Sequence, residues 1–107
     1  MIVALYLLNS PILTGHGLWR FSSLDLAAAR RLAAGGFVSA IGHAASARLL
    51  STVLETEVPV ARIRACLETG DTAIVLRLLE RLPQGIVLDK DALDRLPWEL
   101  GLLQRLE

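Results

Sequence analysis

Apolar and polar residues alternate along this chain with periods that change several times, which predicts strands and helices in turn. Ile2 to Leu8 is an apolar run that ends in Asn-Ser-Pro, the pattern of a buried strand entering a loop, here over residues 9–21. Apolar residues then recur at helical intervals and stop at a pair of glycines. The predicted elements are, in order, strand 2–8, a helix that follows the cap candidates Ser22 and Ser23 and ends before Gly35, strand 37–41, helix 44–54, strands 60–68 and 72–79, helix 89–96 and strand 98–106.

Two of these strands are predicted to form a hairpin. Between residues 60 and 68, Ile63, Ala65 and Leu67 alternate with polar side chains, which is typical of a half-exposed strand. Thr69-Gly70-Asp71 supplies a turn before the next strand. Because a hairpin is antiparallel and the other strands alternate with helices, we expect a single small α/β domain over residues 1–107, with a mixed β-sheet flanked by helices.

The composition limits the partners that the chain can have. Eleven basic and eleven acidic residues cancel, so the chain lacks the overall positive field that draws proteins to duplex nucleic acid. No apolar run approaches the roughly 20 residues that cross a bilayer, so the apolar fraction of 53% is expected to serve a subunit interface. A single cysteine, Cys66, excludes an internal disulfide and a multi-cysteine zinc site. The N-terminal residues also lack the positive flank of a secretory signal. Together with the single cysteine, this favours a cytoplasmic protein without a membrane partner.

The clearest potential for chemistry lies where the strand over 37–41 meets the following helix. Gly42 and His43 stand at this junction, which places an imidazole beside the free backbone N–H groups that begin a helix and that suit a phosphate. Histidine is well suited to general acid–base catalysis near neutral pH. On these residues alone, a histidine that only begins a helix is the commoner case.

The other candidate groups are weaker when they are considered singly. His16 stands between glycines without a second ligand at metal-binding spacing, and the sequence predicts no metal site and no cofactor. Arg62, Arg64 and Arg81 can each clamp a phosphate, although arginines on a strand are more often solvated. The chain has no Walker loop, no dinucleotide-binding glycine motif and no nucleophile elbow.

Four short segments nevertheless follow one another in the order and spacing of a known family. They are Tyr6-Leu7-Leu8-Asn9-Ser10, Ser39-Ala40-Ile41-Gly42-His43, residues 54–62 with Val58-Pro59-Val60, and Arg81-Leu82-Pro83-Gln84-Gly85. From Ile2 to about Leu103 the chain resembles the viral anti-CRISPR ring nucleases of type III systems and their bacterial counterparts. The resemblance implies an α/β homodimer that binds cyclic tetra-adenylate (cA4), the second messenger of type III CRISPR defence, in a cleft across the dimer interface. It also implies that the protein cleaves cA4 without a metal and so switches the signal off.

The resemblance further implies a role for each matching residue. His43 would be the general acid that protonates the departing 5′-oxygen while the neighbouring 2′-hydroxyl of the substrate attacks, which leaves linear di-adenylate with a 2′,3′-cyclic phosphate. Arg81 would neutralise charge on the phosphate and Arg62 would hold the ligand. The remaining segments expected to line the binding site contain Asn9, Ser10, Gly42 and Ser46. Metal-free cleavage needs an oriented nucleophile, a proton for the leaving group and preorganised positive charge, and these groups would supply all three.

One position departs from the family pattern. Relatives carry glutamate in Arg-Leu-Pro-Glu-Gly where this chain has Gln84, at a position associated with activating or orienting the 2′-hydroxyl. Glutamine keeps the shape of glutamate and forms hydrogen bonds, but it cannot accept a proton at neutral pH. The change is compatible with a natural variant that relies on His43 and Arg81, and equally with an engineered slowing of turnover. It is expected to affect the rate more than the binding.

Two other functions stay open on the sequence. The first is a binding module, a sponge or sensor that sequesters a cyclic oligoadenylate with little or no cleavage, which Gln84 favours. The second is a structural or interaction protein in which the Gly-His pair only begins a helix.

Overall fold

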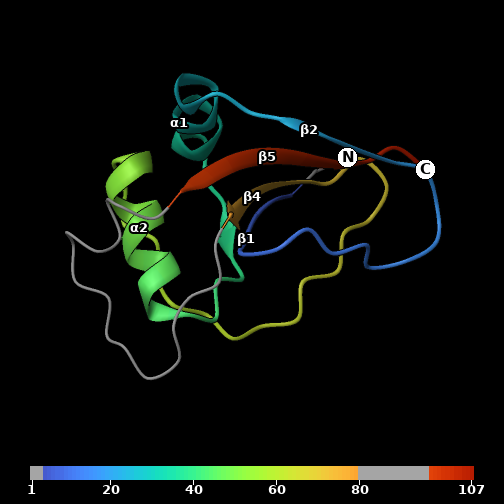
Figure 1. Ribbon diagram of the computed structural model, residues 1–107. Coiled ribbons are helices and arrows are strands. Elements are labelled where there is room, and N and C mark those ends of the chain that lie inside the picture. The colour runs from blue at the N-terminus through green and yellow to red at the C-terminus, as the bar shows by residue number, and fades with distance from the viewer. Residues whose placement is uncertain (1–3, 80–96) are drawn as a thin grey trace.

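The computed structural model describes residues 4–79 and 97–107 (Figure 1). The elements of these residues are β1 (Leu5–Leu8), β2 (Trp19–Ser23), α1 (Leu26–Ala34), β3 (Val38–Ser39), α2 (Ala44–Leu54), β4 (Thr72–Leu78) and β5 (Trp98–Arg105). The predictions of a strand near residues 2–8, a first helix, a short strand within 37–41, the helix over 44–54 and the two later strands are confirmed. The helix predicted over 89–96 lies outside the described residues.

The described strands form one mixed sheet in the order β2-β5-β4-β1-β3. β1 is parallel to both of its neighbours, β3 and β4, whereas β5 is antiparallel to β4 on one side and to β2 on the other. The prediction of a small α/β domain with a mixed sheet is therefore confirmed. β4 lies at the centre of the sheet, and its residues from Ala73 to Leu76 are fully buried, which explains their continuous apolar run.

The predicted hairpin is wrong, and so is the extent of the first loop. Residues 57–68 form no strand, and β4 pairs with β1 and β5 instead. The predicted loop over 9–21 ends early because β2 begins at Trp19. Ser22 and Ser23 therefore belong to a strand, and the N-cap of α1 is Asp25, whose carboxylate accepts a hydrogen bond of 2.8 Å from the Ala28 N–H.

Both helices pack on one face of the sheet and build the larger core. The buried residues of this core are Leu7, Ala29, Ala33, Ile41, Ala47, Leu49, Leu50, Leu54, Val58, Ile74, Leu76 and Leu100. Leu7 comes from β1, Ile74 and Leu76 from β4 and Leu100 from β5, so alternate residues of three strands face the helices. The burial of one such leucine contributes about 1.5–3 kcal/mol to stability, and this layer fixes α2 against the sheet.

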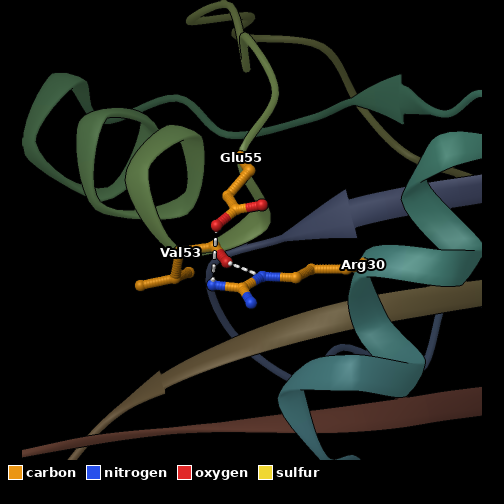
Figure 2. Close-up of polar contacts among 3 residues, drawn as sticks. All are labelled: Arg30, Val53 and Glu55. Carbon is orange, nitrogen blue, oxygen red and sulfur yellow. Dashed lines mark hydrogen bonds and ion pairs between the residues drawn. The ribbon is translucent and has the colours of Figure 1, made fainter.

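The two helices are also joined where α2 ends (Figure 2). Arg30 of α1 donates a hydrogen bond of 2.8 Å from Nε to the Val53 carbonyl, and another of its nitrogens lies 3.4 Å from the Glu55 carboxylate. Glu55 is the C-cap of α2 and adopts a left-handed conformation with φ 56°. Arg30 thus satisfies a carbonyl of the last turn of α2, which the helix itself leaves unpaired. The exposed ion pair with Glu55 contributes little by comparison.

The opposite face of the sheet is covered by irregular chain instead of helices. Figure 1 shows the blue connection after β1 and the yellow connection after α2 running on this side. The buried residues of the second, smaller core are Leu8, Leu67, Ala73, Val75 and Leu103. Ala65 packs against this core beside Leu67, so the alternation in residues 63–67 reflects an extended segment lying on a sheet, not a strand within it.

Asp71 and Arg105 anchor the two connections at the far end of this face. The Asp71 carboxylate accepts hydrogen bonds from the Ala4 N–H at 2.8 Å and the Glu68 N–H at 2.9 Å. The Arg105 guanidinium donates to the carbonyls of Leu67 and His16 and lies over the Trp19 ring. Side chains therefore replace the regular backbone pairing that these connections lack.

Candidate functional site

Three parallel strands end at one edge of the sheet, and the predicted site residues follow them. β1 continues into Asn9 and Ser10, and β3 continues through Gly42 into His43. The register places the end of β3 beside the end of β1, because Ser39 pairs with Leu7, and β4 continues from Val75, the partner of Leu8, to Leu78 in the same direction. In open α/β sheets, ligands bind outside the carboxyl ends of parallel strands. The segments that carry Asn9 and His43, far apart in sequence, thus meet where such a fold is expected to bind a ligand.

The segment around Pro59 lies directly against the segment that leads from β3 to His43. Ser39 Oγ donates a hydrogen bond of 2.7 Å to the Pro59 carbonyl, and the Ala61 N–H donates one of 2.8 Å to the Ile41 carbonyl. One residue further on, Arg62 Nε donates to the Gly42 carbonyl at 3.2 Å. Each contact joins residues 20 positions apart, so the two segments run parallel. Two motifs that are separate in the sequence therefore form one continuous surface.

Gly42 permits the close approach of Arg62. A Cβ atom at position 42 would lie 3.2 Å from Arg62 Cγ, a spacing tighter than ordinary van der Waals contact. A residue with a Cβ at this position would require the Arg62 side chain to shift by a few tenths of an ångström. Glycine thus leaves room for Arg62, whose hydrogen bond to the Gly42 carbonyl keeps the guanidinium beside the residue that immediately precedes His43.

His43 is the N-cap of α2, as the sequence predicted from the break at Gly42. Its backbone carbonyl accepts a hydrogen bond of 3.0 Å from the Ala47 N–H, whereas its exposed side chain makes no capping hydrogen bond. Serine, threonine, aspartate and asparagine usually fill this position because their side chains accept hydrogen bonds from the first turn. The imidazole of His43 therefore forms no hydrogen bond with the helix, and it is exposed to solvent near the first N–H groups of α2.

The other predicted residues differ in how far they reach solvent. Asn9, Ser10 and Arg62 are exposed, whereas Ser46 is 4% exposed within the first turn of α2. Arg81 and Gln84 lie outside the described residues, although β4 ends at Leu78 on the same edge of the sheet. His16 lies far from this edge, since its carbonyl bonds to Arg105 near the last residue of the chain. The structure thus brings Asn9, Ser10, His43 and Arg62 to neighbouring segments.

A pocket of about 600 Å³ opens beside these residues, between the two irregular connections. Its lining residues are Leu8, Asn9, Ile12, Leu13, Thr14, Ala40, Ile63, Arg64, Ala65 and Cys66. Asn9 belongs both to this loop pocket and to the predicted site, and Ile63 directly follows Arg62. The aliphatic side chains of this pocket were not predicted as site residues from the sequence. The pair Ile12-Leu13, placed in a loop between a proline and a glycine, was the available signal.

Residues 4–79 and 97–107 contain neither a cluster of metal-ligating side chains nor a helix that could span a membrane. No three His, Cys, Asp or Glu side chains in these ranges come together in a group that could hold a metal ion. No helix within them is long and apolar enough to cross a membrane.

Comparison with known proteins finds relatives in viruses. The chain is 52% identical over 52 residues to the uncharacterized protein ORF117 of Acidianus two-tailed virus, which covers 49% of this chain and 44% of that protein. It is 32% identical over 69 residues to the uncharacterized protein 26 of Sulfolobus islandicus filamentous virus, covering 64% of this chain and 58% of that protein. These two matches span about half the length of the relatives concerned. A third, to the uncharacterized protein ORF116 of Acidianus filamentous virus 1, is 31% identical over 96 residues and covers 85% of this chain and 83% of the relative.

A solved structure shares the fold. B116 of Sulfolobus turreted icosahedral virus superposes with a TM-score of 0.74 over 95% of this chain and 99% of that chain, at 20% sequence identity. Identity this low shows a common architecture and nothing about chemistry. The sequence profile of one family, however, matches residues 5–100. This range includes strands β1, β3 and β4 and helix α2, which surround the candidate site. The chain therefore belongs to the STIV B116-like family.

Proposed function

We propose that this protein is a metal-independent ring nuclease that cleaves cyclic tetra-adenylate. The observation that carries the proposal is the parallel contact between residues 39–42 and 59–62, which sets Arg62 beside the residue preceding His43. The imidazole of His43, which makes no hydrogen bond to the helix, and the guanidinium of Arg62 therefore lie at the same end of the sheet. General acid catalysis of phosphodiester cleavage requires such a pair, one group to donate a proton and the other to attract the phosphate.

The proposed reaction needs no nucleophile from the protein. The 2′-hydroxyl next to the scissile phosphate forms a bond to phosphorus, and the bond from phosphorus to the 5′-oxygen breaks. His43 gives its proton to that departing oxygen, and the proton lost from the 2′-hydroxyl passes to solvent. The products are linear di-adenylates that end in a 2′,3′-cyclic phosphate. Arg62 binds the ligand, and Arg81 is assigned to the developing charge on the family resemblance.

The proposal includes a homodimer with the substrate across its interface. A two-fold assembly presents every residue twice, so two copies of His43 can act on opposite phosphates of a cyclic tetranucleotide. Apolar surface is available for such an interface, because large apolar side chains are exposed on the described residues. These side chains are Ile12, Leu13, Leu18, Phe21, Leu32, Val38, Val60, Ile63, Leu79 and Leu106. The protein would act in the cytoplasm, where it would end type III CRISPR signalling by removing the messenger.

Incubation of the protein with labelled cA4 in excess EDTA tests the proposal directly. The expected result is conversion to di-adenylate with a 2′,3′-cyclic phosphate, at a rate unchanged by the chelator. Separation of products by chromatography, with mass spectrometry of the termini, measures this. Cleavage that stops in EDTA would contradict the mechanism, and the absence of binding would contradict the proposal as a whole.

One observation favours a second candidate, a cyclic oligoadenylate binding protein that does not cleave its ligand. Gln84 stands where the resemblance implies glutamate, and an amide cannot take a proton from the 2′-hydroxyl at neutral pH. Tight binding of intact cA4 without products in the same assay would support this candidate over the nuclease.

Replacement of Arg62 by alanine is expected to weaken cA4 binding by about tenfold or more, because a charge-assisted hydrogen bond contributes roughly 1.5–3 kcal/mol. The side chain is exposed and bonds only to the Gly42 carbonyl among the described residues, so the variant should fold normally. Isothermal titration calorimetry measures the dissociation constant. Arg48→Ala is the matched control, since Arg48 is an exposed arginine on α2 outside the candidate site. Equal losses in the two variants would show only a general effect of positive charge.

A further inference from the structure

Arg105 contacts both irregular connections at the end of the sheet opposite the candidate site. β5 runs antiparallel to β4, and the Arg105 N–H donates to the carbonyl of Asp71, the residue before β4 begins. The candidate site lies beyond Leu8, whose partner Val75 is four residues further along the chain than Asp71. The rise of a strand therefore separates the two regions by roughly 13 Å along the sheet. Figure 1 shows the end of β5 beside the blue connection, away from α2.

The first connection, residues 9–18, is attached to the described structure mainly through its second half. In its first half, residues 9–13 form no hydrogen bond with other described residues, and the two large apolar side chains are at least half exposed. The groups of the second half that accept hydrogen bonds are Thr14 Oγ and the carbonyls of Gly15, His16 and Leu18. The position of Asn9 therefore depends on β1 before it and on the second half of the connection after it.

The second connection, residues 57–68, is held at both ends. Near the candidate site, Arg62 and the residues before it bond to the segment that leads from β3 to His43. At the other end, the Leu67 N–H donates to Thr14 Oγ at 3.0 Å, which ties this connection to the first one. Between these ends, residues 63–66 form no hydrogen bond with other described residues. The course of this stretch is therefore set by where its two ends are fixed.

The Arg105 guanidinium bonds to both connections at once. One of its Nη atoms donates to the Leu67 carbonyl, and the other donates to the His16 carbonyl at 2.9 Å. Its Nε donates to the Glu107 carbonyl at 3.3 Å, and its central carbon lies 5.3 Å from the centroid of the Trp19 ring. A guanidinium carries its donors in a rigid planar fork. These contacts therefore fix the separation of the two connections at this end.

Residues 105–107 also pack directly on the turn at Gly17. The φ of this glycine is 145°, a conformation that other residues rarely adopt, and a Cβ atom there would overlap the Glu107 carbonyl oxygen. The N–H groups of Leu106 and Glu107 both donate to the Leu18 carbonyl, at 2.7 and 3.3 Å. Gly17 thus permits the close approach that brings Arg105 to the first connection.

We propose that Arg105 is a positioning residue for the candidate site and acts on it through the two connections. It fixes their separation, and thereby the positions of Asn9 and Arg62, before a ligand arrives. This inference rests on the proposed function, since these two residues are assigned there to binding cA4. Groups that are fixed before binding lose less conformational entropy when the ligand enters, so Arg105 increases affinity. It contributes little to the chemical step, because His43 belongs to α2, which packs on the other face of the sheet.

Replacing Arg105 by glutamine tests this role. The dissociation constant for cA4 is expected to rise about three- to thirtyfold, while the single-turnover rate at saturating protein changes by less than about twofold. Isothermal titration calorimetry measures the first quantity and chromatography of the products the second. A variant that is merely destabilised would instead show a lower binding stoichiometry and an unchanged dissociation constant. Arg20→Gln is the matched control, since Arg20 is exposed on β2 outside both connections and the substitution removes the same charge.

A second pair of variants opens the same contact without changing Arg105. Gly17→Ala would push the Glu107 carbonyl away from the first connection, and it should raise the dissociation constant as Arg105→Gln does. Gly36→Ala is its control, because Gly36 also has a positive φ, 102°, but follows α1 and has no atom within 4 Å of the Cβ position. Equal losses of affinity in the two glycine variants would attribute the effect to backbone strain and would contradict the proposed role of Arg105.

Nuclear magnetic resonance without ligand examines the two connections independently of cA4. In Arg105→Gln, the Leu67 N–H should exchange with solvent faster, because the neighbouring tie to the first connection is lost. The amide signals of Asn9 and Arg62 should shift as well, although both residues lie at the opposite end of the sheet. The Ala47 N–H, which bonds within α2, should exchange at an unchanged rate. Arg20→Gln should change none of these signals.

The outcomes separate this inference from the proposed function. If Arg105→Gln binds and cleaves cA4 with an unchanged dissociation constant, the nuclease stands and the role of Arg105 falls. If the amide signals of Asn9 and Arg62 do not shift, the role of Arg105 falls as well, whatever the protein does with cA4. If they shift as expected but the unsubstituted protein neither binds nor cleaves cA4, the nuclease falls while the control of both connections by Arg105 stands.

Discussion

Replacing His43 by alanine is expected to slow cA4 cleavage by about 10²- to 10⁴-fold, the usual contribution of a general acid or base. The dissociation constant for cA4 should change only a few-fold, because the leaving oxygen carries little charge before the bond breaks. His43 makes no side-chain hydrogen bond to α2 and is exposed, so the substitution should leave the melting temperature almost unchanged. Single-turnover cleavage with excess protein separates the chemical step from binding and product release.

The chain supplies its own control for this experiment. His16 is the only other histidine, is also exposed, and lies near Arg105 at the other end of the irregular connections. His16→Ala should therefore cleave cA4 at the rate of the unsubstituted protein. Undiminished cleavage by His43→Ala would remove His43 from the mechanism. A large loss of affinity in that variant would instead assign His43 to ground-state binding.

Replacing Asp71 by alanine is expected to reduce the free energy of unfolding by about 3 kcal/mol, because two hydrogen bonds to a carboxylate contribute roughly 1.5–3 kcal/mol each before relaxation. The carboxylate is 8% exposed and accepts from Ala4 and Glu68, so its loss leaves two N–H groups without partners. The melting temperature should fall by at least about 10 °C, since a domain of this size loses roughly 4 °C or more per kcal/mol. Urea unfolding at one fixed protein concentration measures the change, as dimerisation would otherwise alter the midpoint.

Two further variants define the origin of that loss. Asp71→Asn keeps one acceptor oxygen but turns an NH₂ group toward the other N–H, so its loss should be intermediate. Asp25→Ala removes a carboxylate that accepts only the Ala28 N–H at the exposed start of α1, and should cost about 1 kcal/mol. If Asp71→Ala proved no worse than Asp25→Ala, the link between the start of β1 and the turn before β4 would not be important for stability.

The elements that the sequence predicted well are those whose pattern depends on local packing. Helix α2 begins and ends where the pattern placed it, because its apolar side chains recur at helical spacing and Gly42 interrupts the run before it. The prediction of a strand over 60–68 is wrong because any extended segment that lies on a surface alternates apolar and polar side chains, whether or not it pairs with a neighbouring strand. Leu67 is fully buried in this way. Sheet pairing depends on which edges are free, and no local pattern contains that information.

Strand β2 could have been found from a weaker signal. Trp19 and Phe21 alternate with Arg20 and Ser22, a period of two that was hidden by the loop-like residues before it. Phe21 is exposed at 43% because β2 is an edge strand, and its ring covers Gly101 of β5, where a Cβ atom would overlap it. Gly101 thus makes room for the ring of Phe21, a residue that the sequence pattern had placed in a loop.

The candidate site was predictable only in part for a similar reason. The break at Gly42 pointed to His43 from local sequence, but nothing in the 20-residue spacing to Arg62 indicates that the arginine bonds to the Gly42 carbonyl. The family resemblance predicted that His43 and Arg62 belong to one site, and the structure shows the hydrogen bond from Arg62 to the Gly42 carbonyl. The roles of Arg81 and Gln84 stay predictions, since both residues lie outside the described ranges.

The strand order also governs how the chain can fold. β4 lies at the centre of the sheet, yet its partner β1 precedes it by most of the chain, and the hydrogen bond from Ala4 to Asp71 spans 67 positions. Helix α2 can begin to form locally, whereas β1 gains its second neighbour only after the chain has closed this long loop. Folding is therefore expected to be slow for a domain of this size. A nascent chain that has reached α2 exposes one apolar strand edge until β4 has been synthesised, and during that interval the edge is open to pairing with other chains.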